Sequence, residues 1–279
     1  MMPPLRIISW NAAHRKNRAA KQAEVLLSRS PDLLTLQEVT RGMVDSFQRI
    51  LGAGGFNHFI FSTPPPNPVS RSYGVLVASR FPIEPLPSFS IPWPEKILSV
   101  VVSIGDHAVE LHTAHIPNGS GNGWIKIETL EGLYAGLAKR SQAPRILTGD
   151  FNAPQLELPT GELVSWAQKV MPDGAVRTRK QFRGGSGIRW DEGERRVLSG
   201  LAEFGFRDAF RLLYGYGVSE YSWAMQRKGK SIKRRFDHVF ASLQPVECNY
   251  IHEWREAKLS DHSAIETVFD TNDDLPSTP

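Results

Sequence analysis

A short segment, Arg145–Pro154, places a carboxylate and a carboxamide directly after an apolar stretch. Asp150 and Asn152 are two residues apart, so in an extended chain both side chains point the same way. Gly149 permits the close approach of another backbone, and Pro154 ends strand pairing. Polar groups at the end of a buried strand are costly unless they bind something. An Asx-rich turn is the other interpretation, so this segment alone leaves turn and site open.

The same pattern, an apolar strand followed by an acid, an amide or a histidine, recurs along the chain. The polar residues at these strand ends are Asn11, Glu38, His115, Asp150, Asn152, Asp237, Asp261 and His262. The set is rich in oxygen ligands and contains no thiol, so it suits Mg²⁺ or Mn²⁺ better than a closed zinc site. Clustered carboxylates also repel one another unless a cation lies among them. The set therefore predicts a divalent metal with substrate phosphate in its open coordination positions.

The composition is that of an ordinary globular protein. The chain has 279 residues, 41% hydrophobic and 22% charged, with a net charge of +4 and a pI near 9.2. This mild basic bias suits a polyanionic partner. The single cysteine, Cys248, excludes an internal disulfide and a thiolate metal cluster. Neither a membrane-spanning run nor a signal-peptide pattern is found, so we expect a cytoplasmic, monomeric protein with no membrane contact.

Predicted strands and helices interleave along the whole chain. Apolar patterns predict strands at residues 5–10, 32–39, 58–61, 73–79, 97–104, 108–114, 236–242 and 264–269. Helices are predicted over residues 14–28, 42–51, 124–140, 161–170 and 192–204. No repeat or linker divides the chain, which predicts a single domain over residues 1–270 and a disordered tail at 271–279. The interleaving predicts an α/β (α+β) fold, and the hairpins argue against a purely parallel sheet.

Two segments are strongly basic. Residues 227–235 contain six basic residues and lead directly to Asp237, so at least the end of this run must lie beside the strand ends. A second, glycine-rich segment contains Arg177, Arg179, Lys180, Arg183 and Arg189. Charge runs are usually solvated surface, and this alternative stays open. If the first run follows a nucleic-acid backbone, Lys228, Lys230 and Arg235 contact the substrate.

Six segments resemble, in order, those of the endonuclease/exonuclease/phosphatase superfamily of metal-dependent phosphoesterases. They are residues 9–11, 36–38, 74–83, 148–152, 235–242 and 260–262. Six segments in order are far more specific than any one of them. The resemblance implies a four-layer sandwich of two packed mixed β-sheets flanked by helices, with the site where the strand ends meet. The C-terminal half is most similar to the exonuclease III and apurinic-endonuclease branch.

The resemblance also implies a metal site. Glu38 resembles the main metal-binding carboxylate of the family, assisted by Asn11 and Asp261. One departure concerns this site: many members place a second Asn or Asp two residues after the first Asn, whereas this chain has Ala12 and Ala13. One contact to the metal or its water is therefore expected to be missing.

The remaining roles concern the phosphate. Asp150 resembles the group that orients or deprotonates the attacking water, and Asn152 the residue that places the phosphate. His262 resembles the histidine that binds the scissile phosphate, with Asp237 fixing its tautomer. The expected chemistry is an in-line attack by water without a covalent intermediate.

Two assignments are less direct. His115 stands where the exonuclease III branch has a tyrosine, whereas deoxyribonuclease I uses a histidine in that region. His112, three residues earlier, competes for the same role, and an ordinary buried histidine is the alternative for both. Trp223 could contact a base or an abasic sugar, but a buried core tryptophan fits equally well.

The sequence therefore predicts a Mg²⁺-dependent phosphodiesterase that hydrolyses nucleic acid, with Mn²⁺ as the alternative metal. DNA is the expected substrate, cut by an endonuclease or an exonuclease with a role in repair. A second hypothesis is a phosphoesterase for a small or lipid-linked phosphate, similar to an inositol phosphatase or a sphingomyelinase. A third is a non-catalytic binding module on the same fold, which is disfavoured because every position expected to carry chemistry is occupied.

Overall fold

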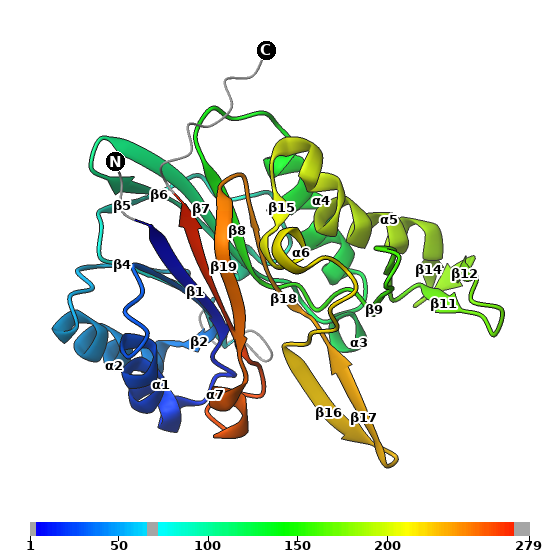
Figure 1. The fold of residues 1–279 in the computed structure, drawn as a ribbon, viewed down its shortest axis with the longest axis horizontal. Coiled ribbons are helices and arrows are strands. Elements are labelled where there is room, and N and C mark those ends of the chain that lie inside the picture. The colour runs from blue at the N-terminus through cyan, green and yellow to red at the C-terminus, as the bar shows by residue number, and fades with distance from the viewer. Residues whose placement is uncertain (1–3, 66–71, 271–279) are drawn as a thin grey trace.

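The computed structural model describes residues 4–65 and 72–270, and the predicted tail at 271–279 lies outside the described residues. In the described part of the chain, two six-stranded sheets pack face to face with helices outside each (Figure 1). The predicted four-layer α/β sandwich with mixed sheets is confirmed, because each sheet contains one parallel pair among antiparallel neighbours.

The first sheet has the strand order β19-β20-β1-β2-β4-β3. Its strands are β1 (Leu5–Asn11), β2 (Leu33–Thr40), β3 (His58–Phe61), β4 (Tyr73–Ser79), β19 (Gln244–Ile251) and β20 (Ala264–Asp270). The second sheet has the order β15-β18-β8-β7-β6-β5. Its strands are β5 (Ile83–Pro85), β6 (Ile97–Ile104), β7 (His107–His115), β8 (Arg145–Asp150), β15 (Arg207–Asp208) and β18 (Asp237–Ala241).

The central strands are buried on both faces. In β1, Leu5 and Ile7 belong to the core between the sheets, whereas Ile8 and Trp10 pack on the helical side. This alternation follows from the two-residue period of a strand. Such strands appear as nearly continuous apolar runs in the sequence, which is why their positions were predictable.

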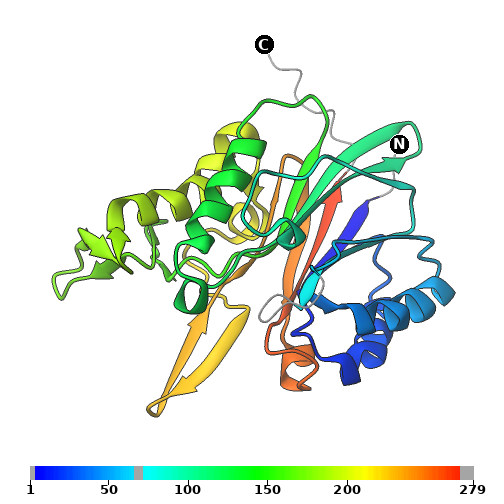
Figure 2. The same cartoon turned by 180° about the vertical axis from the view of Figure 1, so that it is seen from behind.

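Helices cover the two outer faces of the sandwich, as the view from behind in Figure 2 also shows. The first sheet is covered by η1 (Lys16–Arg18), α1 (Ala19–Leu27), α2 (Arg41–Ala53) and α7 (His252–Glu256). The second is covered by α3 (Gly119–Asn122), α4 (Ile125–Leu137), α5 (Gly187–Leu198) and η3 (Gly200–Phe204). Helix α6 (Ala209–Tyr214) instead adds Ala209 and Phe210 to the core between the sheets. A further 3₁₀ turn, η2 (Pro94–Lys96), precedes β6. None of the helices in residues 4–65 and 72–270 is long and apolar enough to cross a bilayer.

Three sequence predictions were wrong in detail. The helix predicted over residues 161–170 is replaced by β10 (Leu163–Val164) and β11 (Gln168–Val170). Gly161 has a φ of 89°, and pairing with β9 (Leu156–Glu157) and β12 (Val176–Thr178) overrides local helical propensity. The helix predicted over residues 14–28 starts late, because His14 adopts a φ of 44°. Strand β19 was missed altogether.

Small hairpins extend beyond the sandwich. One consists of β16 (Trp223–Arg227) and β17 (Lys230–Arg234), which project downward from the sheets in Figure 1. The chain between β8 and α5 forms others, in which β9 pairs with β10, β11 with β12, and β13 (Gln181–Phe182) with β14 (Gly185–Ser186). The basic, glycine-rich segment begins in β12 and includes hairpin β13–β14. Both basic segments therefore leave the core and flank the edge where the strands end.

Candidate active site

The strand ends of the second sheet meet at one edge of the sandwich. Because β7 and β8 are parallel and β18 is antiparallel, His115 is in register with Asp150, and Asp150 with Asp237. Gly149 permits this contact, since a Cβ at its φ of 138° would lie 1.9 Å from the carbonyl oxygen of Ala114. Two strand ends and one strand start thus bring three titratable side chains together.

Glu38 and Asn11 bring the first sheet into the site. Glu38 occupies an irregularity in the pairing of β2 with β4 and has a φ of 53°. Asn11 Nδ2 donates to Glu38 Oε1 at 3.3 Å and to Asp150 Oδ2 at 3.0 Å. Its Oδ1 accepts from the backbone N–H of Ala13 at 2.9 Å. Asn11 is therefore a buried link between two carboxylates. It does not line the pocket that opens at this edge of the sandwich.

His14 was not among the predicted site residues. Its Nδ1 lies 2.7 Å from Glu38 Oε2. Burial disfavours a charged Glu38, but the hydrogen bond with His14 and the nearby His115 lower the pKa of Glu38 to about 2. The same hydrogen bond raises the pKa of His14. The sequence signal was a histidine three residues after the strand-end Asn11, which the predicted helix obscured.

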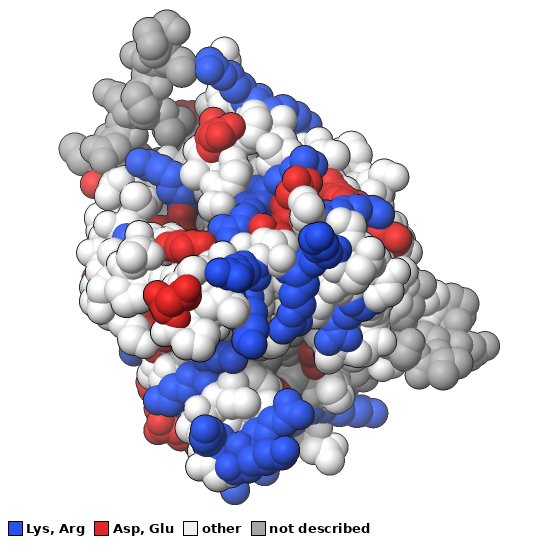
Figure 3. Space-filling view, turned by 90° about the vertical axis from the view of Figure 1, so that its right-hand side faces the viewer, with Lys and Arg blue, Asp and Glu red and all other residues white. Residues whose placement is uncertain are grey.

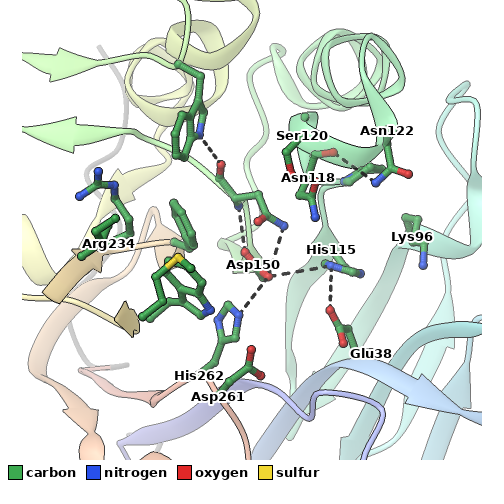
Figure 4. Close-up of a pocket in the computed structure, with 18 of the residues that line it drawn as sticks. Glu38, Lys96, His115, Asn118, Ser120, Asn122, Asp150, Arg234, Asp261 and His262 are labelled. Atoms are coloured by element: carbon green, nitrogen blue, oxygen red, sulfur yellow. Dashed lines mark hydrogen bonds and ion pairs between the residues drawn. The ribbon is translucent and has the colours of Figure 1, made fainter. Parts of the chain in front are cut away.

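His262 and Asp237 form a buried dyad. His262 Nδ1 lies 2.7 Å from Asp237 Oδ2, and His262 Nε2 lies 3.8 Å from Asp150 Oδ2. Although burial disfavours the imidazolium, the Asp237 and Asp150 carboxylates raise the pKa of His262 to about 10. His262 is thus charged at neutral pH, with Nδ1–H donated to Asp237 and Nε2–H directed toward Asp150 (Figure 4).

Asp150 and Asn152 are fixed by the turn after β8. The Asn152 N–H donates to Asp150 Oδ1 at 2.9 Å, and Asn152 Nδ2 donates to the carbonyl of Ile116 at 2.9 Å. Asn152 has a φ of 50°, a conformation that asparagine tolerates better than most residues. Burial and the Asp237 carboxylate raise the pKa of Asp150 to about 7, against the opposing charge of His262. Such a carboxyl can take up and release a proton near neutral pH.

The structure distinguishes His115 from His112. His115 Nε2 lies 3.5 Å from Glu38 Oε1 and 3.9 Å from Asp150 Oδ2, between the two carboxylates (Figure 4). Burial lowers the pKa of His115 to about 4, so its imidazole is neutral at pH 7. His112 instead lies 2.8 Å from the Ser99 hydroxyl and outside the pocket. His115 is therefore the histidine that faces the site.

Support for Asn152 comes from a buried ion pair on α4 and α5. Lys126 Nζ lies 3.0 Å from Glu194 Oε1 and donates to the Asn152 carbonyl at 2.7 Å. Trp166 Nε1 donates to the same carbonyl at 2.9 Å, and the backbone N–H of Trp166 donates to Glu194 Oε2. Sequence reasoning missed these residues. The available signal was a lysine on the apolar face of α4, one helical turn before Leu130.

The pocket at this edge has a volume of about 610 Å³ and two chemically different walls. Glu38, His115, Asp150, Asp261 and His262 occupy the polar side (Figure 4). Another part of the lining is largely apolar and aromatic, formed by Trp166, Trp223, Met225, Ile232 and Phe236. Such a cavity can hold a charged group and a flat or apolar group side by side.

Hairpin β16–β17 supplies much of the apolar wall and two cations. Trp223 pairs with Arg234, Met225 with Ile232, and Arg227 with Lys230. Because side chains alternate along a strand, residues 223, 225 and 227 share a face with 232 and 234, and all five line the pocket. Predicted substrate-binding Trp223 is therefore in the pocket, whereas Lys228 and Lys230 lie outside it. The two-residue period from Trp223 selects Arg227, and Arg234 shares this face because it pairs with Trp223 across the hairpin.

Ser222 ties this hairpin to the dyad. Its hydroxyl accepts hydrogen bonds from the backbone N–H groups of Phe236 and Asp237, at 2.9 and 3.0 Å. Its carbonyl accepts from the N–H of Ser263 at 2.7 Å, beside a bridge between Trp223 and His262. The base of the hairpin is thus bonded to the segments that carry both members of the dyad.

Arg235 has a different position from the one predicted. It is buried outside the pocket, where its guanidinium binds Glu157 and Asp208 at 2.5 and 2.6 Å. Arg211 lies 2.6 Å from the same Glu157, and His238 lies 3.3 Å from Asp208. Despite burial, these cations lower the pKa of Glu157 to about 2 and hold the pKa of Asp208 well below its usual range. Its charge is paired inside the protein, and its side chain does not line the pocket.

The basic, glycine-rich segment contributes one cation to the pocket. Arg183, at the tip of hairpin β13–β14, lines the pocket, and its φ of 50° precedes Gly184 at 76°. Figure 3 shows Lys and Arg gathered on this side of the molecule, including its lower end, where hairpin β16–β17 projects. The pocket therefore opens between two hairpins that carry positive charge.

Two groups of ligand atoms could hold a divalent cation. Asp150, Asp237 and His262 form a buried cluster whose ligand atoms lie within 4.8 Å of one another. Glu38 and the exposed Asp261 form the second group on the pocket's polar side. The charged His262 already pairs with Asp237 and opposes a cation in the first group. Carboxylate oxygens facing an open pocket match the preference of Mg²⁺ and Mn²⁺.

The family model that describes the endonuclease/exonuclease/phosphatase family matches residues 8–262. No curated protein sequence matches the chain significantly. An AP endonuclease from Archaeoglobus fulgidus is similar in structure, with 21% identity, a TM-score of 0.68, and 96% of this chain and 100% of that chain covered. The structure of D. rerio TDP2 complexed with single strand DNA product has 17% identity and a TM-score of 0.66, with 96% of this chain and 99% of that chain covered. An endonuclease/exonuclease/phosphatase from Beutenbergia cavernae has 18% identity and a TM-score of 0.61, with 95% of this chain and 71% of that chain covered.

The chain belongs to the endonuclease/exonuclease/phosphatase family, because the family model covers nearly all of it. The predicted family is thereby confirmed, and the solved structures share its fold. Fold and family together define a phosphodiester hydrolase.

Proposed function

We propose that this chain is a Mg²⁺-dependent phosphodiesterase that hydrolyses nucleic acid, with DNA as its substrate and Mn²⁺ as the alternative metal. The observation that carries the proposal is the meeting of the His262–Asp237 dyad with Asp150 and Glu38 in one pocket. That pocket is bordered by a hairpin whose sequence from Trp223 to Arg235 contains no acidic residue. A cleavage site beside a cationic strand pair suits a long polyanion.

Each predicted catalytic side chain has a role that its environment supports. His262, charged at neutral pH, donates from Nε2 to a non-bridging phosphate oxygen. Asp150, whose pKa is about 7, accepts the proton of the attacking water, and Asn152 positions the phosphate. His115 is neutral and lies between Glu38 and Asp150, where it orients the water or the leaving group. Asp237 holds the tautomer of His262 through the 2.7 Å contact.

The metal-binding group of this proposal is Glu38 with Asp261, and Asn11 holds Glu38 in place. The low pKa of Glu38 keeps it ionised, as a metal ligand must be. A bound divalent cation neutralises charge on the phosphate oxygens. The cation is placed here and not in the Asp150–Asp237–His262 cluster, where the dyad already occupies Asp237 Oδ2 and His262 Nδ1.

The walls of the pocket support a nucleic-acid substrate. Arg227 and Arg234 on one hairpin and Arg183 on another are suited to successive backbone phosphates. Trp223 and Phe236 have ring centroids 5.6 Å apart and offer an aromatic surface for a base or sugar. The TDP2 structure named above is a complex with single strand DNA product, and another similar structure is an AP endonuclease. We extend DNA as the substrate, and with it a role in DNA repair, to this chain.

The test is a hydrolysis assay with added Mg²⁺ or Mn²⁺ on labelled duplex DNA, single-stranded DNA, abasic duplex and RNA. A chromogenic phosphodiester serves as the small-substrate control. We expect metal-dependent cleavage of DNA, abolished by chelator and by Glu38→Gln in a protein that still folds. The matched control is Glu24→Gln, an exposed carboxylate on α1 that pairs with Lys21.

The apolar wall also favours a second candidate, a phosphoesterase for a small or lipid-linked phosphate. Met225, Ile232 and Trp223 would contact an alkyl or aromatic group beside the phosphate. Hydrolysis of the small phosphodiester or an inositol phosphate, with none of DNA or RNA, would establish this candidate instead. Full activity in excess chelator would contradict both.

Three further expectations remain part of the proposal. We treat residues 4–65 and 72–270 as one domain, because the core between the sheets draws on both of them. The expected monomeric state and cytoplasmic location stay predictions.

A further inference from the structure

The carboxylate of Glu38 is contacted from two sides by imidazoles. His14 Nδ1 lies 2.7 Å from Oε2, and His115 Nε2 lies 3.5 Å from Oε1. The sequence predicted that one contact to the metal or its water is missing, because Ala12 and Ala13 follow Asn11. His14, one residue further on, supplies a contact at this carboxylate.

The backbone around His14 is held in an uncommon conformation. Ala13 and His14 have φ values of 54° and 44°, two consecutive non-glycine residues in the left-handed region. Such conformations persist only where the surroundings impose them, and they concentrate at functional sites. The imposing contacts are hydrogen bonds from the Ala13 N–H to Asn11 Oδ1 and from the His14 N–H to the Glu38 carbonyl, at 2.9 and 3.0 Å.

The imidazole of His14 is also fixed by stacking, although the residue is exposed. Its ring stacks on Tyr73 with centroids 5.5 Å apart and an interplanar angle of 8°. Tyr73 in turn packs against His115 at 5.5 Å and lines the pocket. A surface histidine without a function would not need both a fixed backbone and a stacked ring.

The position of Nδ1 fits a ligand as well as a hydrogen bond. Nitrogen and oxygen ligands lie about 2.1 Å from a divalent cation, so neighbouring ligand atoms lie about 3 Å apart. The 2.7 Å between His14 Nδ1 and Glu38 Oε2 is close to that separation. Asp261 directs its carboxylate into the same side of the pocket (Figure 4).

We propose that His14 is a metal ligand, which joins Glu38 and Asp261 in a mixed nitrogen–oxygen site that prefers Mn²⁺ over Mg²⁺. An imidazole ligand favours transition metals, whereas all-oxygen sites suit Mg²⁺. This inference rests on the proposed function, because it assumes that the metal binds at Glu38.

The test measures metal binding without substrate. Mn²⁺ is titrated into the full chain while free Mn²⁺ is followed by electron paramagnetic resonance, and Mg²⁺ binding is measured by calorimetry. Wild type is compared with His14→Ala and with His107→Ala, an exposed histidine at the opposite end of β7. We expect His14→Ala to weaken Mn²⁺ binding at least about tenfold, a loss that even outer contacts of a metal site can cause. Its Mg²⁺ affinity should change much less, and His107→Ala should match wild type.

A spectroscopic readout separates a ligand from a side chain that only holds Glu38. Electron spin-echo modulation of bound Mn²⁺ should contain coupling to an imidazole nitrogen in wild type, and His14→Ala should lose it. Equal weakening of both metals, or unchanged nitrogen coupling in His14→Ala, would overturn the inference. If wild type binds both metals and Glu38→Gln binds neither, the proposed function stands whatever His14→Ala does. If wild type binds neither metal, the proposed function itself fails.

Discussion

Two buried charge clusters lie on either side of the start of β18, and they are balanced in different ways. In one, Glu157 and Asp208 are neutralised by the guanidinium groups of Arg211 and Arg235. In the other, the active-site cluster, Asp150 and Asp237 are accompanied by the imidazole of His262. Arg235 and Asp237, two residues apart in the sequence, belong to different clusters.

The difference teaches how the same fold separates stability from chemistry. In the arginine cluster the carboxyl pKa values are lowered, so its charges are fixed at neutral pH. In the active-site cluster the pKa of Asp150 is raised to about 7, and Asp237 Oδ1 has no hydrogen-bond partner among the described residues. Charges that are fully paired cannot respond to a substrate, whereas incompletely paired ones can.

The largest expected effect is on turnover and follows from removing the charge of Asp237. Asp237→Asn should leave the fold intact but reduce kcat roughly 10³–10⁴-fold, because His262 loses the partner that fixes its tautomer and stabilises its charge. The measurement is steady-state hydrolysis of DNA, with circular dichroism to confirm folding. The double variant Asp237→Asn/His262→Ala should be little worse than His262→Ala alone. Additive losses would mean that the two do not act as a unit.

The converse change should affect stability and spare turnover. Arg235→Met leaves two buried carboxylates short of their main cation, and we expect the free energy of unfolding to fall by about 3–5 kcal/mol. Guanidinium chloride unfolding measures this loss, and turnover per folded molecule should change little. Arg207→Met, an exposed arginine on β15, is the matched control. A large loss of turnover in a stable Arg235→Met protein would remove the distinction between the clusters.

Acidic pH should also lower the stability of the fold through the arginine cluster. Glu157 and Asp208 have lowered pKa values in the folded protein, so their contribution is complete above pH 4.5 and is lost as the pH falls toward 2. Each group should cost up to about 1.4 kcal/mol of stability per pH unit in that window. Glu157→Gln should flatten the decline measured by urea unfolding between pH 5 and pH 3. An unchanged decline in that variant would show that other groups dominate.

The smallest expected effect concerns the hairpin. Replacing Lys228, Lys230 and Lys233 with Ser should weaken DNA binding across sequences and reduce the slope of log K against log salt by about 0.9 per lost phosphate contact. Arg227→Ser with Arg234→Ser should weaken binding more for each removed charge, because these two side chains line the pocket. Fluorescence anisotropy at several salt concentrations measures both. Equal losses on a small phosphodiester would contradict a role in holding a polynucleotide.

Much of this molecule was predictable because its central strands have strong local signals. Strands predicted at residues 58–61 and 73–79 agree with β3 and β4, since continuous apolar runs ending at Gly, Pro or Ser leave little choice. Polar residues at the end of β8 and just before β20 predicted in the same way that Asp150 and His262 need partners, and both line the pocket.

What escaped prediction depends on contacts between distant segments. His14 adopts a left-handed φ because the Glu38 carbonyl accepts its N–H, and no local pattern encodes that bond. Arg235 was predicted to bind the substrate because its neighbours in the sequence are basic. Its side chain instead forms an ion pair with Glu157, which is 78 residues earlier. Alternation along β17 places Arg234 and Lys233 on opposite faces, but the pairing of the hairpin was not known from the sequence.

The anchorage of the hairpin through Ser222 has a consequence for how this enzyme can change. The hydroxyl and carbonyl of Ser222 attach the hairpin at its base, close to Asp237, while β16 and β17 pair only with each other beyond that point. The outer residue pairs of the hairpin can therefore change in number and composition, because no other strand in residues 4–65 and 72–270 pairs with them. Substrate choice and bond cleavage can evolve separately here. An engineer could exchange residues 225–232 for another two-stranded insert and retarget the hydrolase while its reaction centre stays as it is.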